Sequence, residues 1–157
     1  MNIHKYPTLS SLAFAIFRTH FLRENEIPQL SGKIAKDIRQ SYTGGAVDMY
    51  IPENEEGEKV YAYDVNSLYP FVMKEFDMPT GKPKQFFGDI RKVDDKAFGF
   101  FYCKITAPDN LLHPILQTHF KNKSVLRTVA GISSWKDMIF SPEMDNAIKF
   151  GYKILFL

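Results

Sequence analysis

The sequence has 157 residues, of which 45% are hydrophobic, 24% charged and 15% aromatic, so its length and composition suit one globular domain with a sizeable core. Its apolar stretches are too short to span a membrane, and one cysteine with four scattered histidines excludes both a disulfide scaffold and a zinc module. Twenty Lys and Arg against eighteen Asp and Glu leave a net charge of +2, which is too small to indicate nucleic acid by bulk charge alone.

The charge is unevenly distributed along the chain. Residues 1–40 carry six basic and three acidic side chains (+3), residues 41–64 carry one basic and six acidic (−5), and residues 65–157 carry thirteen and nine (+4). An acidic island therefore lies between two mildly basic flanks. Its run of glutamates from Glu53 to Glu58 is typical of a solvated hairpin tip.

Hydrophobic periodicity predicts the elements of the N-terminal half. Apolar residues at spacings of three and four predict an amphipathic helix over residues 9–24, and a short second helix is expected over residues 33–40. From Tyr42 onward, the spacing between apolar residues changes to two, which is typical of strands. Strands are predicted over residues 46–51 and 59–65, and together they would form a hairpin with the acidic run at its tip.

The C-terminal half is predicted to alternate between helix and strand. Ser67 is expected to cap a helix over residues 68–76, with Pro70 in its first turn. The later elements are expected to be a strand over residues 97–106 that buries Cys103, a weakly extended segment over 126–134, a helix over 142–150 and a strand over 152–157. These elements predict an α+β fold. Because the chain stops on a strand, we expect it to be an internal portion of a longer protein.

The segment Tyr61 to Pro70, YAYDVNSLYP, carries the most chemistry. A helix start presents unpaired backbone amides and the positive end of the helix dipole, which favour anions. Asp64 just before that start would repel a bare phosphate but suits a divalent cation that neutralises one, and Mg²⁺ prefers carboxylate, phosphate and water oxygens. The segment could therefore hold a metal–nucleotide triphosphate. The same residues would equally suit an ordinary strand-to-helix turn with a solvated Asp64.

Two motifs support a resemblance to a known family. DVNSLYP resembles motif A (DxxSLYP) of family B DNA polymerases, with matches at Asp64, Ser67, Leu68, Tyr69 and Pro70. YTGG, from Tyr42 to Gly45, resembles the YxGG signature of the protein-primed branch, which comprises polymerases of linear mitochondrial plasmids, bacteriophages and adenoviruses. Taken alone, YTGG would suit a plain turn before a strand. The resemblance extends from about Pro7 to the end of the chain.

The resemblance implies a partial polymerase palm, made of an antiparallel hairpin and helices, with the start of the insertion that contacts the terminal priming protein. Residues 1–40 would be a helical linker after an exonuclease domain. Residues 41–110 would be the partial palm with both motifs, and residues 111–157 the start of the insertion.

The resemblance also implies roles for the motif A residues. Asp64 would be a catalytic aspartate and a ligand of Mg²⁺ or Mn²⁺, with the carbonyl of Val65 completing the metal shell. The backbone amides of Ser67 and Leu68 would contact the phosphates of the incoming dNTP. The ring of Tyr69 would lie under the deoxyribose and reject ribonucleotides.

The YxGG residues imply a nucleic-acid partner. Tyr42, Gly44 and Gly45 would approach the DNA template backbone, because glycine lacks the Cβ that keeps a backbone away from phosphates. The implied partners are a DNA template and primer, dNTP and a terminal priming protein, with no membrane. By analogy with relatives encoded on mitochondrial plasmids, the expected location is the mitochondrion.

The sequence differs from complete members of the family because it lacks two of their motifs. Neither motif B (KxxxNSxYG) nor motif C (around DTD), which supplies the second metal-binding aspartate, occurs in it. We therefore expect a polymerase fragment that is inactive alone. One alternative is a non-catalytic remnant that retains at most nucleotide or DNA binding. Another is an unrelated α+β domain in which DVNSLYP is accidental.

Overall fold

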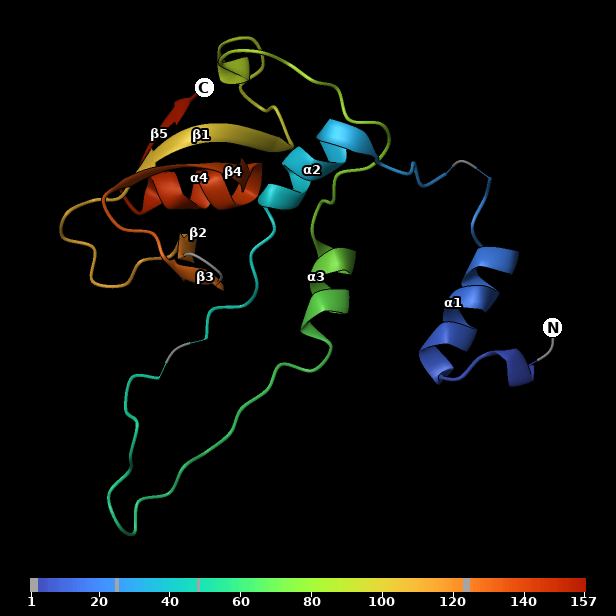
Figure 1. Ribbon diagram of the computed structural model, residues 1–157, viewed down its shortest axis with the longest axis horizontal. Helices are drawn as coiled ribbons and strands as arrows, with labels where there is room; N and C mark the ends of the chain where they lie inside the picture. Colours follow the sequence, from blue (N-terminus) through green and yellow to red (C-terminus); the bar gives the residue numbers. More distant parts are fainter. Residues whose placement is uncertain (1–2, 25, 48, 123–124) are drawn as a thin grey trace. The chain divides into compact units, whose positions relative to one another are not determined.

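The computed structural model describes residues 3–24, 26–47, 49–122 and 125–157. Helices and antiparallel strands are mixed along the chain, which confirms the predicted α+β class (Figure 1). The chain divides into two compact units. The first comprises Met1–Leu30 with Thr80–Lys84, and the second comprises Ser31–Pro79 with Gln85–Leu157.

The first unit contains the expected N-terminal helix. A 3₁₀ turn, η1 (Ile3–Lys5), precedes α1 (Leu9–His20). Thr8 and Ser11 cap α1 reciprocally: the Ser11 amide donates to the Thr8 hydroxyl over 3.1 Å, and the Thr8 amide donates to the Ser11 hydroxyl over 3.2 Å. The helix ends before the predicted residue 24, and Phe14 on it remains exposed.

The second unit is built on a three-stranded antiparallel sheet with the strand order β4-β1-β5. Its strands are β1 (Phe100–Thr106), β4 (Ser134–Phe140) and β5 (Lys153–Phe156), and α4 (Ser141–Lys149) lies along them (Figure 1). In the central strand β1, Cys103 pairs with Asp137 on one side and with Phe156 on the other. The predicted strand before residue 106, the helix after 141 and the final strand are therefore confirmed.

Among the described residues, seven buried hydrophobic side chains form the core of this unit. They come from the sheet, from α4 and from the segments that flank them: Cys103, Ile105, Leu116, Ile139, Met144, Ala147 and Tyr152. Burial, with a smaller effect of the Asp89 charge, raises the pKa of the Cys103 thiol to about 12. The thiol therefore stays protonated, and the prediction that Cys103 is buried is confirmed.

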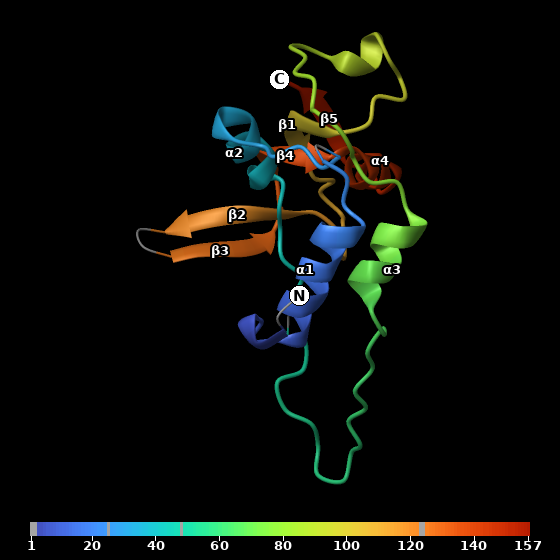
Figure 2. The same ribbon diagram turned by 90° about the vertical axis from the view of Figure 1, so that its right-hand side faces the viewer.

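A separate two-stranded sheet consists of β2 (Gln117–Asn122) and β3 (Val125–Ala130) (Figure 2). Side chains of β2 connect it to the rest of the unit. The Thr118 hydroxyl donates to Asp137 on β4 over 3.1 Å, and the His119 Nε2 lies 3.1 Å from the Tyr42 carbonyl oxygen. The Gly131 amide donates to the Leu116 carbonyl over 2.9 Å, which continues the β2–β3 ladder. The predicted extended segment over residues 126–134 overlaps β3, whereas β2 and nearly all of β4 lie outside the predictions.

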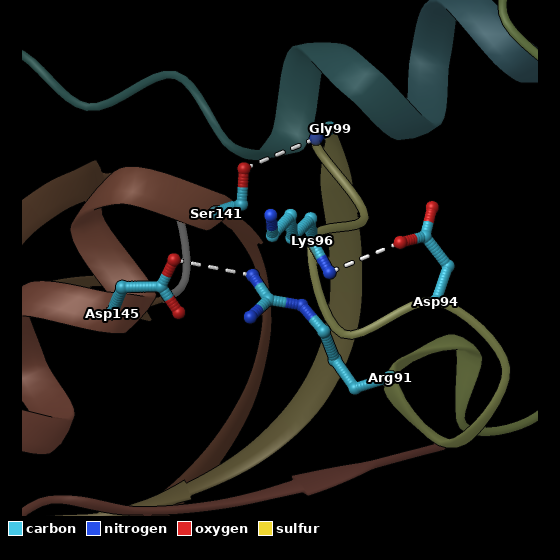
Figure 3. Close-up of polar contacts among 6 residues, drawn as sticks. All are labelled: Arg91, Asp94, Lys96, Gly99, Ser141 and Asp145. Carbon is cyan, nitrogen blue, oxygen red and sulfur yellow. Dashed lines mark hydrogen bonds and ion pairs between the residues drawn. The ribbon is translucent and has the colours of Figure 1, made fainter.

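The segment before β1 is fixed to α4 by polar contacts (Figure 3). In the short turn η2 (Ile90–Lys92), the Arg91 guanidinium pairs with Asp145 over 3.2 Å and lies 5.8 Å from the centroid of the Phe101 ring. The Gly99 amide donates to the Ser141 hydroxyl over 3.1 Å. These contacts hold the residues that lead into β1 against α4.

The remaining helices are short and close to their predicted positions. The helix α2 (Gly32–Gln40) packs against β4, and α3 (Leu68–Glu75) begins just after Ser67. The longest described helix, α1, has 12 residues. In the part of the chain that the structure describes, no helix is long and apolar enough to cross a membrane.

The predicted hairpin of residues 46–51 and 59–65 is wrong. Asp48 lies outside the described residues, and the rest of both segments contains no strand. The turn at the acidic tip does form, because the Glu58 amide donates to the Glu55 carbonyl over 3.1 Å. However, Val60 and Tyr63 are 79% and 92% exposed. A two-stranded hairpin is marginal unless one face is covered, and these apolar side chains are uncovered.

Candidate functional site

The motif A residues line one open depression at the start of α3. Its volume is about 370 Å³, and its lining residues are Asp64, Val65, Ser67, Leu68, Tyr69 and Pro70. The first hydrogen bond of the helix runs from the Phe71 amide to the Ser67 carbonyl over 2.9 Å. The amides of Leu68 and Tyr69 precede that bond, so they have no acceptor within the helix. The depression thus combines a carboxylate with the positive end of a helix.

Ser67 has an unusual backbone conformation. Its φ of 54° and ψ of 40° lie in the left-handed region, which residues other than glycine rarely adopt. Ser67 occupies the predicted N-cap position, but its side chain makes no capping hydrogen bond, so the predicted side-chain cap is wrong. Such a conformation costs on the order of 1–3 kcal/mol and is typical of functional sites. It turns the chain at the point where Asp64 and the helix start share the depression.

Asp64 is suited to only part of a metal site. Its carboxylate is exposed, and together with the Val65 carbonyl it offers the oxygen ligands that Mg²⁺ prefers. Among the described residues, no three His, Cys, Asp or Glu side chains gather in a way that could hold a metal ion. The described residues therefore offer a metal ion one carboxylate and one carbonyl oxygen, and further ligands would be needed to hold it.

Tyr69 lines the depression without joining the hydrophobic core. Its side chain is 70% exposed, so the ring is accessible to a ligand. Phe71 and Met73, further along α3, are also exposed. The arrangement of the motif A residues is therefore determined by the local backbone rather than by packing.

The YTGG segment follows α2 directly and has open space in front of its glycines. The Arg39 guanidinium lies 5.2 Å from the centroid of the Tyr42 ring, a cation–π contact that leaves Tyr42 66% exposed. A Cβ added to Gly44 or Gly45 would meet no described atom within 4 Å, and neither glycine has a positive φ. Neither crowding nor backbone conformation therefore requires glycine here. Their small size leaves room for a molecule outside the chain.

His119 contacts the same segment from β2. Its Nε2 lies 3.1 Å from the carbonyl oxygen of Tyr42, and its Nδ1 lies 3.5 Å from the hydroxyl of Thr128. The sequence indicates only a structural or surface role for His119, because no metal-ligating residue is near it. The contact joins residues far apart in the chain, so no local motif could have revealed it.

A small cavity of about 10 Å³ adjoins the YTGG segment. Its polar lining includes Ser41, Thr43, Gln117, Asp137 and Glu143. Burial and, secondarily, the Asp137 carboxylate raise the pKa of Glu143, and the buried Gln117 Oε1 has no hydrogen-bond partner. The cavity is large enough for about one water molecule, which such polar groups favour.

The predicted site residues fall into two groups. Those from Asp64 to Tyr69 share the depression at α3, whereas Tyr42, Gly44 and Gly45 do not line it. The second group is supported by α2 and β2 instead. The residues of each motif therefore lie close to one another, but the two motifs form separate local sites.

Comparisons with known proteins place these motifs in a wider context. The chain matches the family described as "DNA polymerase type B, organellar and viral" over residues 1–157. A "Probable DNA polymerase" of Ascobolus immersus is 45% identical over 153 residues, which are 97% of this chain and 12% of that protein. For a "Probable DNA polymerase" of Neurospora intermedia the identity is 41% over 160 residues, which are 98% of this chain and 16% of that protein.

A phage protein gives a shorter match. The "DNA polymerase" of Bacillus phage Nf is 38% identical over 81 residues, which are 50% of this chain and 14% of the phage protein. No solved structure gives a significant match. The chain thus spans between 12% and 16% of the length of the two fungal proteins.

Proposed function

Because the chain belongs to the organellar and viral type B DNA polymerases, we propose that it carries part of the active site of a DNA-directed DNA polymerase. The interpretation of DVNSLYP as accidental in an unrelated domain is thereby wrong. In the proposed reaction the 3′-hydroxyl of a protein- or DNA-primed strand loses its proton and attacks the α-phosphorus of a dNTP. A new phosphodiester bond forms, the bond to the β-phosphate breaks, and pyrophosphate leaves.

The shared depression at the start of α3 is the observation that most supports this proposal. It is lined by Asp64, by the N-cap residue Ser67 and by the first helical residue Leu68, whose backbone amides lie at the start of α3. Those amides would donate to the β- and γ-phosphates of the dNTP, which is where the helix dipole favours negative charge. Tyr69, exposed in the same depression, would lie against the sugar and exclude a 2′-hydroxyl.

Asp64 and the Val65 carbonyl are the residues that would hold Mg²⁺ or Mn²⁺. When bound, the metal would lower the pKa of the primer hydroxyl and neutralise charge on the triphosphate. Asp64 supplies the negative charge that binds the ion, and its exposed position lets the nucleotide reach it. The oxygen-only donor set agrees with a hard cation.

DNA is the second proposed partner. The open space at Gly44 and Gly45 would admit a template phosphate close to the backbone, and the exposed Tyr42 would contact the same strand. We further propose that residues 111–157 begin the insertion that contacts a terminal priming protein, with residues 1–40 as a linker and residues 41–110 as a partial palm. The proposed location is the mitochondrion.

The chain alone is proposed to bind its ligands without catalysing the reaction. It contains neither the motif B nor the motif C string, and it offers one site carboxylate where two-metal transfer needs more. Mixed with a primed template, Mg²⁺ and dNTP, the 157-residue chain should therefore give no primer extension.

The nucleotide site can be tested by titrating the chain with dATP in the presence and absence of Mg²⁺, using calorimetry. We expect Asp64→Asn to weaken the Mg²⁺-dependent binding about tenfold or more, because it removes the charge that holds the metal. Asp77→Asn is the matched control, since Asp77 is another exposed aspartate just beyond the end of α3. Magnesium-dependent binding that survives Asp64→Asn unchanged would contradict the assigned role.

A further inference from the structure

We propose that His119 is a positioning residue for DNA binding, because its imidazole fixes the carbonyl of Tyr42 and thereby holds the YTGG segment in place. The inference rests on the proposed DNA contact of Tyr42, Gly44 and Gly45. It adds a residue from outside both motifs, contributed by the β2–β3 hairpin.

The geometry determines the tautomer of the ring. A backbone carbonyl can only accept, so the His119 Nε2 that lies 3.1 Å from the Tyr42 oxygen must carry the proton and donate it. In the neutral ring Nδ1 is then an acceptor, and the Thr128 hydroxyl lies 3.5 Å from it. Thr128 is directly opposite His119 in the β2–β3 register. The ring is therefore oriented from both sides.

The contact connects the YTGG segment to the core of the unit. Thr118, next to His119 on β2, donates to Asp137 on β4, whose neighbour in the sheet is the central strand β1. The packed sheet thus holds β2, and with it the imidazole of His119, in position. Among the described residues, the other contacts of Tyr42 are with Arg39, namely a backbone hydrogen bond of 3.2 Å and the cation–π contact.

The segment needs such support because the chain beyond it has no regular structure. Residues 43–47 and 49–66 contain no strand or helix. Binding DNA through an unsupported loop costs conformational entropy, whereas a loop held in its bound shape avoids part of that cost. His119 would therefore act on affinity by preorganising the backbone, without touching the DNA.

The test measures binding of a fluorescein-labelled primed DNA duplex with a single-stranded template overhang by the full 157-residue chain. We expect His119→Ala to weaken binding about two- to tenfold, the effect of losing one hydrogen bond. His119→Gln, which retains an N–H donor, should recover most of the affinity. His113→Ala, at an exposed histidine in the loop before β2, should leave it unchanged.

Two further readouts separate positioning from other roles. The slope of affinity against salt concentration should be unchanged in His119→Ala, because no phosphate contact is lost. Nitrogen NMR of the free protein should show His119 in its Nε2–H form, and amides 43–45 should exchange faster in His119→Ala.

The possible failures are distinguishable. If the wild-type chain does not bind DNA, the proposed DNA contact is wrong and the inference fails with it. If the wild type binds and Tyr42→Ala weakens binding while His119→Ala does not, only the role of His119 is overturned. A His119→Gln variant that folds, as judged by circular dichroism, but binds no better than His119→Ala would also overturn it.

Discussion

The sheet unit around β1 and the segment from Tyr42 to the end of α3 differ in how their structure is maintained. In the first, Cys103 and Ile105 are almost completely buried and share a core with Met144 of α4. In the second, most of the described apolar side chains remain exposed, including those of Tyr69 and Met73. The motifs that resemble polymerase signatures all lie in the second region.

This difference indicates that stability and chemistry are carried by different parts of the chain. The packed region gains its stability from burial of apolar surface, which does not depend on any ligand. The motif region has isolated features instead of a core, such as the left-handed backbone of Ser67 and the long-range contact of His119 with Tyr42. Departures from local structural preference are expected at functional sites, and Ser67 is one of them.

The same Met→Ala substitution in the two regions should have very different effects on stability. Met144→Ala should lower the free energy of unfolding by about 2–5 kcal/mol, because Met144 is 1% exposed and its loss leaves a cavity. Met73→Ala should change it by less than about 0.5 kcal/mol, since Met73 is 66% exposed. Urea denaturation followed by circular dichroism measures both. Equal effects would show that the two regions are packed alike.

Alanine substitutions at two glycines give a second matched pair, with a smaller expected effect on stability. A Cβ on Gly131 would clash with the indole ring of Trp135, whereas one on Gly44 would meet open space. Gly131→Ala should therefore destabilise the chain by about 1–3 kcal/mol, and Gly44→Ala should leave stability nearly unchanged.

The ranking of the two glycine substitutions should be reversed for DNA binding, where Gly44→Ala should have the larger effect. Gly44→Ala should weaken binding of the primed duplex, because a methyl group would hold a phosphate away from the backbone. Gly131→Ala should affect binding only as far as it unfolds the protein, which a thermal melt would reveal. A Gly44→Ala variant with full DNA affinity would mean that the open space is unused.

The helix α4 and the strands β1 and β5 could be predicted because their sequence pattern and their packing agree. The helices α1 and α3 could be predicted from their local sequence pattern alone, because neither has a buried residue. The pattern around residues 46–65 predicted strands equally clearly, but nothing covers Val60 and Tyr63, so no ladder forms. The strand β2, with the sequence QTHFKN, has too little apolar alternation to be recognised. It forms because β3 pairs with it, a contact that local pattern does not encode.

The candidate site could be predicted only where a contiguous motif carries it. All residues from Asp64 to Pro70 except Asn66 line one depression, in agreement with the placement of this string at a helix start. The left-handed conformation of Ser67 has no signal in the sequence, because serine is not a residue that favours it. The contact between His119 and Tyr42 depends on tertiary structure and could not be derived from spacing.

Hydrogen–deuterium exchange of the chain, with and without Mg²⁺ and dATP, tests most directly whether the motif region is the nucleotide site. We expect slower exchange at the amides of residues 65–69 and 71, which surround the start of α3, and unchanged exchange in β1 (Figure 1). Asp64→Asn should abolish the slowing. Unchanged exchange at the start of α3, or slowing confined to the packed sheet, would contradict the proposed site.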